Sequence, residues 1–410
     1  MAEIALLRDK RIILGICGSI AAYKAVDLAS KLTQAGALVD VVMTEAAQRF
    51  VSPLTFQAVS GRPVYRDMWR AEASGGLPSH IAHIGLAEGA DLLVIAPATA
   101  NTLAKLAGGL ADDLLAVTVL AARCPLLIAP AMDGGMVEHP ATQANFEILR
   151  QRGAHIIEPE SGRLASGLVG SGRLPETPTL IGHIRRVLGL DGELSGHKLV
   201  VTAGGTREAL DPVRYISNRS SGKQGFAIAQ AALDAGADVL LISAAENLRA
   251  PIGSTLVSVD SAEAMRASVL AHVAESSALI MAAAVADYRP RSVSEQKIKK
   301  SDNPLTLPLE RTPDILMAIK AQREHTGYPM IVVGFAAESE NLLENASGKL
   351  QAKGLDLLVA NDITAADAGF AVDTNRVLVL DMDGGAHKID LTSKAAIGAY
   401  IIERVGGLLA

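Results

Sequence analysis

The chain has 410 residues, of which 49% are hydrophobic and 20% are charged, and its formal net charge is −6. This length predicts two or three domains with sizeable cores, and the acidic balance argues against a nucleic-acid binder, which needs a basic face. The two cysteines, Cys17 and Cys124, form no C-x-x-C pair, which argues against a disulfide framework and a cysteine-based zinc site. We find neither a signal peptide nor an apolar run of ~18 residues, so we expect a cytoplasmic protein with no membrane partner.

In the first half, apolar runs of strand length alternate with helix-like stretches. The runs are continuously apolar, which is typical of strands buried on both faces of a parallel sheet. Strand–helix–strand repetition predicts a doubly wound sheet. The predicted strands lie in 11–19, 37–44, 90–98, 124–132 and 154–159, with helices in 20–35 and 136–152.

A polar, glycine-rich stretch at 188–197 interrupts this pattern, so we place a domain boundary there. The sequence therefore predicts two Rossmann-like α/β domains in tandem, 1–190 and 191–410. The segment 286–303 has no period and predicts a mobile loop. Predicted strands of the second half lie in 198–206, 237–244, 277–285, 330–338 and 355–362, followed by a hairpin over 376–391 that turns at 383–385.

The first strand ends in GICGSIAAYKA, where Gly15, Gly18 and Ser19 predict a tight turn into a helix. Backbone N–H groups and the helix dipole favour a phosphate at such a turn, although many of these turns carry glycine for packing alone. The G-x-G-x-x-G pattern is absent, and Thr44 stands where a nicotinamide enzyme needs an acidic residue for its ribose. A hydroxyl here suits flavin mononucleotide (FMN) better.

Two more loops of this half follow strand ends. Thr99 and Asn101 follow the third run, at the edge of an open α/β sheet where ligands bind; the alternative role is a helix cap. The loop PAMDGGM (130–136) follows the fourth run. His83 precedes the third run, and a lone histidine is more often a surface or capping residue than a catalyst.

The motifs GxxGSIAAYK, HIxLA, APATANTLAKxAxGxADDL and PAMxxxM occur in this order. With them, residues 10–185 resemble the FMN-dependent cysteine decarboxylases, the family that includes phosphopantothenoylcysteine decarboxylase. The resemblance implies that flavin oxidises the cysteinyl thiol of the substrate to a thioaldehyde, with His83 as base. Carbon dioxide then leaves, and the enethiolate is protonated and reduced by the same flavin. The implied FMN contacts are Gly18, Ser19, Ile20, Thr44, Pro97, Ala98, Thr99, Asn101 and Met132.

Two positions depart from the pattern of these decarboxylases. Asp133 stands where the family usually has an asparagine that holds the substrate carboxylate, and an ionised aspartate there would repel it. Ser166 stands where the family usually has a cysteine as proton donor, and a hydroxyl is a far weaker acid than a thiol of pKa ~8.5. The last proton therefore comes from another group or from water, or the reaction is impaired.

In the second half, the loop SNRSSGKQG places Asn218, two serines and Lys223 before a helix, which predicts an anion site. It is not a P-loop, and the alternative is a solvated, capped helix start. Asp287 follows a strand end, a position suited to a Mg²⁺ ligand near nucleotide phosphates. The run KIKK at 297–300 is either a solvated basic surface or a phosphate clamp.

The motifs TREALDPVRYISNxSSGKxG, AAVADYR, KIKK, GFAAE and ANDI resemble the bacterial phosphopantothenate–cysteine ligases that use cytidine triphosphate (CTP). The resemblance implies that phosphopantothenate attacks the α-phosphorus of CTP, releasing pyrophosphate, and that the cysteine amine opens the acyl-cytidylate. It implies Asn218 and Lys297 as catalytic residues, Asp287 as a Mg²⁺ contact, and Asn218 and Asn361 as substrate contacts. The implied CTP contacts are Ser220, Ser221, Gly222, Met281, Ala282, Ala283, Asp287, Lys297, Pro313, Asp314, Ile315, Phe335, Lys349 and Lys353.

Together, the halves resemble the fused bifunctional enzymes of coenzyme A biosynthesis. Dimeric ligase units and trimeric decarboxylase units, and from them a dodecamer, are implied by the resemblance only. One alternative is a working ligase with an impaired decarboxylase half. Another is a non-catalytic flavin-binding regulator, which the motif-complete second half disfavours.

Overall fold

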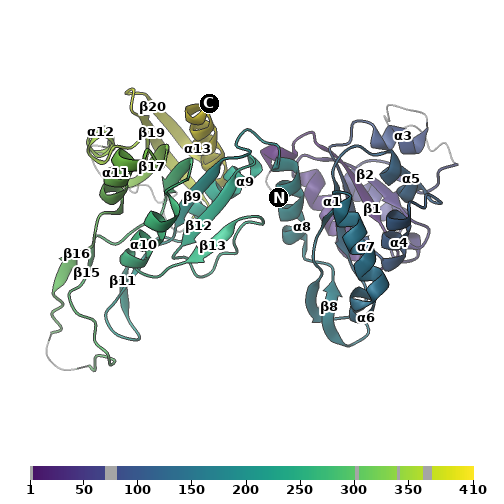
Figure 1. The fold of residues 1–410 in the computed structure, drawn as a ribbon, viewed down its shortest axis with the longest axis horizontal. Helices are drawn as coiled ribbons and strands as arrows, with labels where there is room; N and C mark the ends of the chain where they lie inside the picture. The colour runs from purple at the N-terminus through teal and green to yellow at the C-terminus, as the bar shows by residue number, and fades with distance from the viewer. Residues whose placement is uncertain (1–2, 70–80, 301–303, 339–341, 363–371) are drawn as a thin grey trace. The chain divides into compact units, whose positions relative to one another are not determined.

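The computed structural model describes residues 3–69, 81–300, 304–338, 342–362 and 372–410. Its internal contacts divide the chain into two compact units, Met1–Gly189 and Leu190–Ala410. Each is a parallel-sheet α/β unit, so the predicted fold class is confirmed (Figure 1). Among the helices of the described residues, none has the length and apolar character needed to cross a membrane.

The first unit contains a six-stranded sheet in the order β3-β2-β1-β4-β5-β6, and every neighbouring pair is parallel. Successive side chains of β1 point to opposite faces, and both faces are buried: Ile12 belongs to one core cluster and Ile13 to the other. The strands are β1 (Arg11–Ile16), β2 (Leu38–Met43), β3 (Val64–Tyr65), β4 (Leu92–Ala98), β5 (Leu126–Pro130) and β6 (His155–Ile156).

Helices cover both faces of this sheet. The core cluster on one face includes residues of α1 (Ala22–Gln34), α2 (Pro53–Ser60) and α8 (Thr177–Gly189). The cluster on the other face includes residues of α3 (Ala82–Ala87), α4 (Ala100–Gly108), α5 (Leu114–Ala121) and α7 (Pro140–Gln151). This double cover explains why the strands have continuously apolar sequences.

The second unit contains an eight-stranded sheet in the order β13-β12-β9-β14-β17-β18-β19-β20. Pairing is parallel up to β18, and the last two strands form the predicted antiparallel hairpin. The strands are β9 (Lys198–Ala203), β12 (Asp238–Ser243), β13 (Thr255–Ser258), β14 (Ala278–Met281), β17 (Ile331–Glu338), β18 (Leu357–Asp362), β19 (Thr374–Asp381) and β20 (Ala386–Ser393). The helices are α9 (Lys223–Asp234), α10 (Ala262–His272), α11 (Ile315–Thr326), α12 (Leu342–Lys353) and α13 (Lys394–Leu409).

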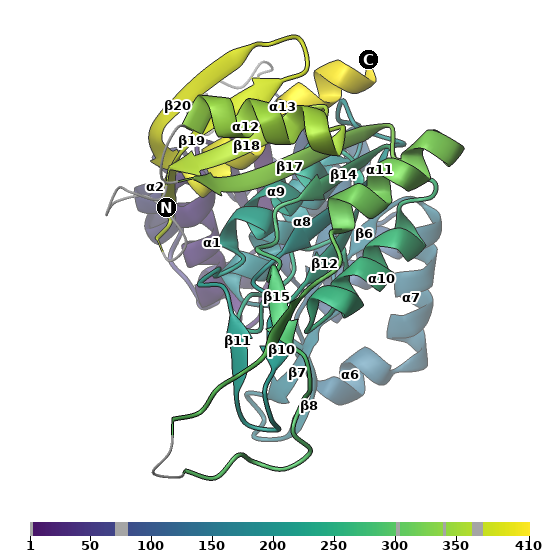
Figure 2. The same cartoon turned by 90° about the vertical axis from the view of Figure 1, so that its left-hand side faces the viewer.

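Two short hairpins project from the second unit, and we call them together the arm (Figure 2). One consists of β10 (Arg207–Ala209) and β11 (Tyr215–Ser217), and the other of β15 (Tyr288–Pro290) and β16 (Leu309–Arg311). The prediction of an unstructured segment over 286–303 is therefore wrong at its start, because Tyr288–Pro290 pairs with a strand beyond the segment. Part of that prediction, 301–303, lies outside the described residues.

Other differences from the sequence prediction have local causes. The predicted helix over 136–152 is two helices, α6 (Gly134–Glu138) and α7, because Pro140 begins α7 and disfavours helical geometry at His139 before it. The hairpin of β7 (Glu160–Arg163) and β8 (Val169–Arg173) was not predicted. Its glycine-rich sequence carries no apolar period that would reveal strands.

Candidate active sites

A cavity of about 710 Å³ in the first unit lies at the carboxyl ends of β1, β2, β4 and β5. This is where open α/β sheets bind ligands. Predicted FMN contacts that line it are Gly18, Ser19, Thr44, Thr99, Asn101 and Met132. The other predicted contacts do not line it in the described structure: Pro97 and Ala98 end β4, with Ala98 fully buried, and Ile20 is 59% exposed beside Ser19.

The loops that line this cavity are held by close packing and by hydrogen bonds to neighbouring residues. A Cβ atom on Gly18 would lie 2.5 Å from the Cβ of Ala46, so only glycine lets the two loops approach this closely. Thr99 caps α4 by accepting a hydrogen bond from Thr102 N at 3.4 Å. The Thr102 hydroxyl donates to Cys17 Sγ at 3.1 Å, and burial raises the pKa of that thiol to about 11. Thr99 is thus both a helix cap and part of the cavity wall.

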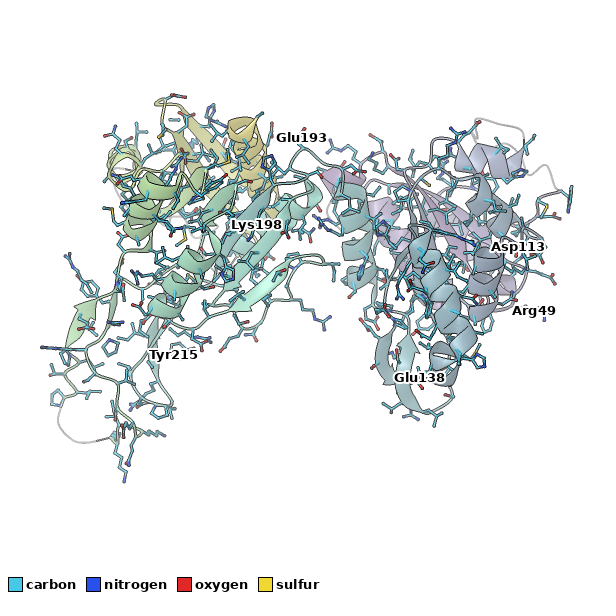
Figure 3. The ribbon with its side chains drawn as sticks, viewed as in Figure 1. Arg49, Asp113, Glu138, Glu193, Lys198 and Tyr215 are labelled. Atoms are coloured by element: carbon cyan, nitrogen blue, oxygen red, sulfur yellow. The ribbon has the colours of Figure 1, made fainter. Side chains whose placement is uncertain are left out.

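Charged residues at this cavity were missed by the sequence analysis. Lys105 Nζ lies 2.7 Å from Asp112 Oδ1 and 2.9 Å from Asp113 Oδ2, and the hydrogen bond to Asp112 raises the pKa of Lys105. Arg49 also lines the cavity; Figure 3 labels it with Asp113. The LAKLAGGLADDL motif contains three of these charges, but its sequence alone does not show that they face a ligand.

The predicted catalytic residues of the first unit do not line this cavity in the described structure. His83 lies in α3 and is partly exposed. Asp133 caps α6 through a 3.2 Å bond from Gly135 N, and Ser166 Oγ donates to Asp133 Oδ2 at 2.7 Å. The structure therefore brings Asp133 and Ser166 together directly beside Met132, which does line the cavity.

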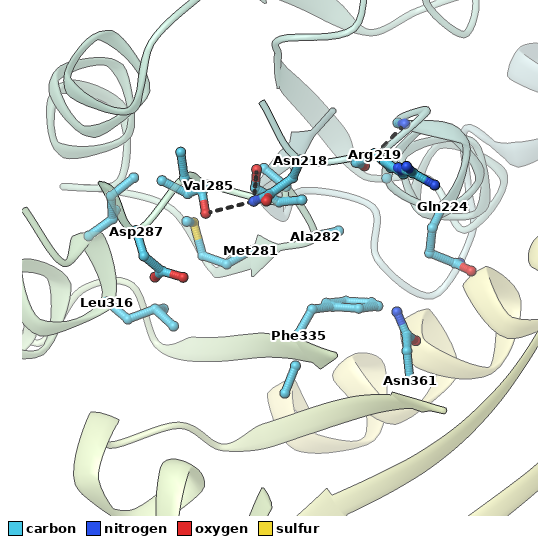
Figure 4. Close-up of a pocket in the computed structure, with 18 of the residues that line it drawn as sticks. Asn218, Arg219, Gln224, Met281, Ala282, Val285, Asp287, Leu316, Phe335 and Asn361 are labelled. Carbon is cyan, nitrogen blue, oxygen red and sulfur yellow. Dashed lines mark hydrogen bonds between the residues drawn. The ribbon is translucent and has the colours of Figure 1, made fainter. Parts of the chain in front are cut away.

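The second unit has a cavity of about 920 Å³ (Figure 4). It collects residues from the anion loop before α9, from the carboxyl-terminal parts of β14, β17 and β18, from the start of α11 and from the end of α12. The predicted residues that line it are Asn218, Ser220, Ser221, Gly222, Met281, Ala282, Ala283, Asp287, Pro313, Asp314, Ile315, Phe335, Lys349, Lys353 and Asn361. Of the predicted nucleotide contacts, Lys297 alone is not in the lining that the structure describes; it is exposed on the arm.

The anion loop has a defined geometry. The Asn218 amide donates to the carbonyl oxygens of Ala284 and Val285 at 3.2 and 3.1 Å, which ties the loop to the segment after β14 (Figure 4). Gly222, the cap residue of α9, has φ +79°, and a Cβ there would lie 2.8 Å from that of Ala245. The first residues of this 12-residue helix line the cavity, and the start of a helix carries unpaired backbone N–H groups that favour an anion.

A second charged region of the cavity joins α11 to α12. Asp314 caps α11 by accepting a bond from Met317 N at 3.2 Å, and Lys353 Nζ lies 3.3 Å from Asp314 Oδ2. Lys349 stands one turn before Lys353 on the same helix and also lines the cavity. The predicted nucleotide contacts of these two helices are therefore neighbours in space.

Polar residues near Asn361 were also missed. Asn375 donates to Asn361 Oδ1 at 3.1 Å, and Gln224 Oε1 is buried without a hydrogen-bond partner among the described residues. Lys394 is 6% exposed. Its burial lowers the pKa of its ammonium group, and the nearby positive charge of Lys223 lowers it further. All of these residues line the cavity. They come from α9, β19 and α13, and no sequence motif signals that these elements meet.

The Asp287 carboxylate points into the cavity (Figure 4). Among the described residues, no cluster of three or more histidine, cysteine, aspartate or glutamate side chains could hold a metal ion alone. A Mg²⁺ bound mainly by nucleotide phosphates needs only one or two carboxylates, so a single aspartate at this place fits that type of site.

Comparisons with known proteins divide the chain in the same way. Residues 3–189 match a family model described as flavoprotein, and residues 194–408 match one described as DNA/pantothenate metabolism flavoprotein C-terminal domain. A solved structure of the C-terminal domain of coenzyme A biosynthesis bifunctional protein CoaBC is 35% identical, covers 53% of this chain and 98% of that one, and has a TM-score of 0.46.

Full-length relatives carry the same name. The coenzyme A biosynthesis bifunctional protein CoaBC of Bacillus subtilis (strain 168) is 45% identical over 406 residues, covering 98% of each chain. The protein of that name from Mycobacterium tuberculosis (strain ATCC 25618 / H37Rv) is 44% identical over 413 residues, covering 98% of this chain and 97% of its own. The chain belongs to the family of coenzyme A biosynthesis bifunctional proteins.

Proposed function

We propose that this chain catalyses two consecutive steps of coenzyme A biosynthesis. The first is the CTP-dependent condensation of 4′-phosphopantothenate with cysteine through an acyl-cytidylate. The second is the FMN-dependent decarboxylation of 4′-phosphopantothenoylcysteine to 4′-phosphopantetheine. The observation that carries the proposal is the second cavity, which brings together nearly all the residues that the ligase resemblance implies. We assign decarboxylation to 1–190, ligation to 191–410, and the enzyme to the cytoplasm.

In the ligase site, the start of α9 with Ser220, Ser221 and Gly222 binds phosphate groups through backbone and hydroxyl donors. Asn218 holds the acyl-cytidylate, and Lys297 of the arm neutralises charge that develops as pyrophosphate leaves. Asp287 binds a Mg²⁺ ion carried by the nucleotide. The apolar wall of Met281, Ala282, Ala283, Ile315 and Phe335 encloses the base and sugar.

The region around Asn361 binds phosphopantothenate. Its amide contacts phosphopantothenate, and the buried acceptor Gln224 Oε1 gives this region a group that a substrate N–H or O–H can satisfy. Lys349 and Lys353 donate to the nucleotide, with Lys353 held in place by Asp314.

The first cavity fits FMN. It combines hydroxyl and amide groups from Ser19, Thr44, Thr99 and Asn101 with an apolar wall from Met132, and Gly18 permits close approach. When bound, the flavin would oxidise and later re-reduce the substrate at the carbon that bears its sulfur. The protein then contributes binding, orientation and proton transfer: His83 takes a proton, and Asp133 with Ser166 faces the substrate carboxylate.

We further propose dimeric ligase units and trimeric decarboxylase units, which together form a dodecamer. Large exposed apolar side chains on the arm support a contact with a second copy of the chain: Tyr215 is 55% exposed, Val293 57% and Leu305 58%. Figure 3 labels Tyr215 on this projection. Size measurement in solution tests the assembly, and a monomer at micromolar concentration would reject it.

A working ligase with an impaired decarboxylase is the second candidate function. The hydrogen-bonded Asp133–Ser166 pair, in place of an amide and a thiol, favours it. One coupled assay separates the two: phosphopantothenate, cysteine and CTP are supplied, and phosphopantothenoylcysteine, phosphopantetheine and carbon dioxide are measured. Both products in one purified protein with a flavin spectrum support the bifunctional enzyme. Accumulation of phosphopantothenoylcysteine alone supports the impaired form, and no consumption of CTP rejects the proposed function.

A further inference from the structure

The basic segment KIKK of the arm is held at its backbone by an ion pair from the neighbouring hairpin. Asp211 Oδ2 accepts a hydrogen bond from Ile298 N at 3.1 Å, and Arg214 Nη2 donates to Ile298 O at 2.8 Å. Both backbone groups of Ile298 are therefore engaged. Its two neighbours in the chain are Lys297 and Lys299, so the starting points of both lysine side chains are fixed.

The ion pair is itself rigidly built. Asp211 is 3% exposed and accepts bonds from Val213 N and Arg214 N, both at 2.8 Å. The Arg214 side chain donates two further hydrogen bonds to this carboxylate, from Nε at 3.0 Å and from Nη2 at 2.5 Å. These side-chain bonds from Arg214, with the backbone donors, hold the pKa of Asp211 well below its usual range. A lowered pKa favours the ionised carboxylate, and both of its oxygens accept hydrogen bonds.

The same ion pair joins two hairpins, each of which adjoins the ligase cavity at one of its strands. Strand β11 runs directly into Asn218, and β15 directly follows Asp287; both residues line the cavity. A second bond, from Ser294 N to Leu210 O at 3.0 Å, links the hairpins close to the ion pair. The arm therefore has a direct connection between the KIKK segment and the chain that leads to Asn218.

We propose that Asp211 and Arg214 are positioning residues of the ligase: by holding Ile298, they keep Lys297 in register with the Asn218 loop. The inference rests on the proposed catalytic role of Lys297. An exposed lysine on an unrestrained loop loses rotational and chain entropy each time it enters a site, which lowers its contribution to transition-state stabilisation. Fixing the adjacent backbone removes part of that loss before substrate binds.

A purely structural ion pair makes a different prediction. The Asp211 carboxylate is buried, so the loss of a purely structural pair would lower the stability of the fold, but it would not act selectively on one catalytic step. A positioning role instead lowers the turnover number while leaving the KM for CTP unchanged, because Lys297 acts on charge that develops in the transition state.

The test is Asp211→Asn in the full-length enzyme, which preserves side-chain size but removes the carboxylate. We expect ligase turnover to fall at least ~10-fold, within the range for one electrostatic donor, with the KM for CTP within about twofold of its original value. The matched control is Glu310→Gln, which removes a 2.9 Å ion pair with Arg289 on the same arm but leaves Ile298 held. Its turnover should stay within about twofold of the unaltered enzyme.

A double-mutant cycle then asks whether Asp211 acts through Lys297. In a Lys297→Gln background, Asp211→Asn should change turnover by less than about twofold, because the lysine that it positions is gone. An equal loss in both backgrounds, or no loss in either, would overturn the proposal.

Folding and the assigned function are checked separately. If Asp211→Asn lowers decarboxylation or the unfolding temperature, Arg214→Lys replaces it in the cycle. This change keeps the charge but cannot reach both Asp211 and the Ile298 carbonyl, and the same outcomes apply. Absence of CTP-dependent ligation in the unaltered enzyme would reject the proposed function itself, whereas a working ligase with an additive cycle rejects only the positioning role.

Discussion

The two cavities lie at corresponding places, beyond the carboxyl ends of parallel strands, but they differ in what their own unit supplies. The second cavity collects the anion loop, the apolar wall, Asp287 and the lysines of α12 in about 920 Å³. The first collects hydroxyl and amide groups for a cofactor in about 710 Å³, while His83, Asp133 and Ser166 do not line it in the described structure. In the first unit all three residues proposed to act on the substrate lie outside the described lining, whereas in the second unit only Lys297 of the proposed residues does.

The difference follows from the kind of chemistry proposed for each unit. Nucleotide transfer depends on positioned donors and charge, and the residues implied for it line one cavity, with the exception of Lys297 in the described structure. In a flavin reaction the cofactor carries the electrons, and the protein supplies binding, orientation and proton transfer. The three residues proposed for proton transfer and carboxylate binding lie outside the described lining of the cofactor cavity. Single substitutions in the two units test this contrast, because each should affect the chemistry of one unit only.

The largest effect is expected from His83→Asn. Loss of a general base should lower decarboxylation about 10²–10⁴-fold, while flavin stays bound because His83 does not line the described part of the cavity. Carbon dioxide release and the visible flavin spectrum measure the two properties. The control is His155→Asn in β6 of the same unit, which should leave decarboxylation within about twofold. A near-normal rate in His83→Asn would remove this residue from the mechanism.

Lys297→Gln should lower ligase turnover at least ~100-fold, within the range for one electrostatic donor. Decarboxylation should not change, because separate units hold the two cavities. Both rates are measured on the same preparation, with Lys299→Gln as the matched control on the other side of Ile298. Equal loss of both activities would indicate misfolding or disrupted assembly. No loss of either would mean that KIKK is only a solvated surface.

Thr99→Ala should lower both the stability of the protein and its affinity for FMN, because Thr99 caps a helix and also lines the flavin cavity. It removes the cap of α4, which should cost about 1 kcal/mol of stability, and it removes a hydroxyl from the flavin cavity, which should weaken FMN binding about two- to tenfold. Ser261→Ala removes the equivalent cap of α10 in the second unit. It should lower stability similarly and leave FMN affinity unchanged. Titration of the apoprotein with FMN and thermal unfolding measure these effects, and unchanged FMN affinity in Thr99→Ala would place its hydroxyl outside the contacts.

The sequence predicts those elements that are specified by their own residues and immediate neighbours in the chain. Continuously apolar runs such as 11–19 reveal doubly covered strands, and the Asp383-Gly384-Gly385 turn marks the hairpin, where Gly384 has φ +85°. Short strands escape prediction because pairing, not composition, defines them: Tyr288–Pro290 is a strand only because Leu309–Arg311 lies beside it. For the same reason, the motifs identify Asn218 and Asp287, whereas Gln224 and Lys394 become visible only when α9 and α13 are packed together.

The smallest expected effect is that of Asp133→Asn. The carboxylate of Asp133 lies beside the wall residue Met132 and accepts a hydrogen bond from Ser166, so an incoming substrate carboxylate meets a like charge there. An asparagine has the same shape, and its amide donates to Ser166 or to the substrate. Because partly exposed charges interact by about 0.2–1 kcal/mol, the KM of the decarboxylase for its substrate should fall by a factor of about 1.4 to 5. Steady-state decarboxylation measures it, with Glu138→Gln, at an exposed position of α6 outside the cavity lining, as the control for a general change in charge. If Asp133→Asn abolishes turnover instead, Asp133 is itself the acid of the reaction, and the repulsion argument is wrong.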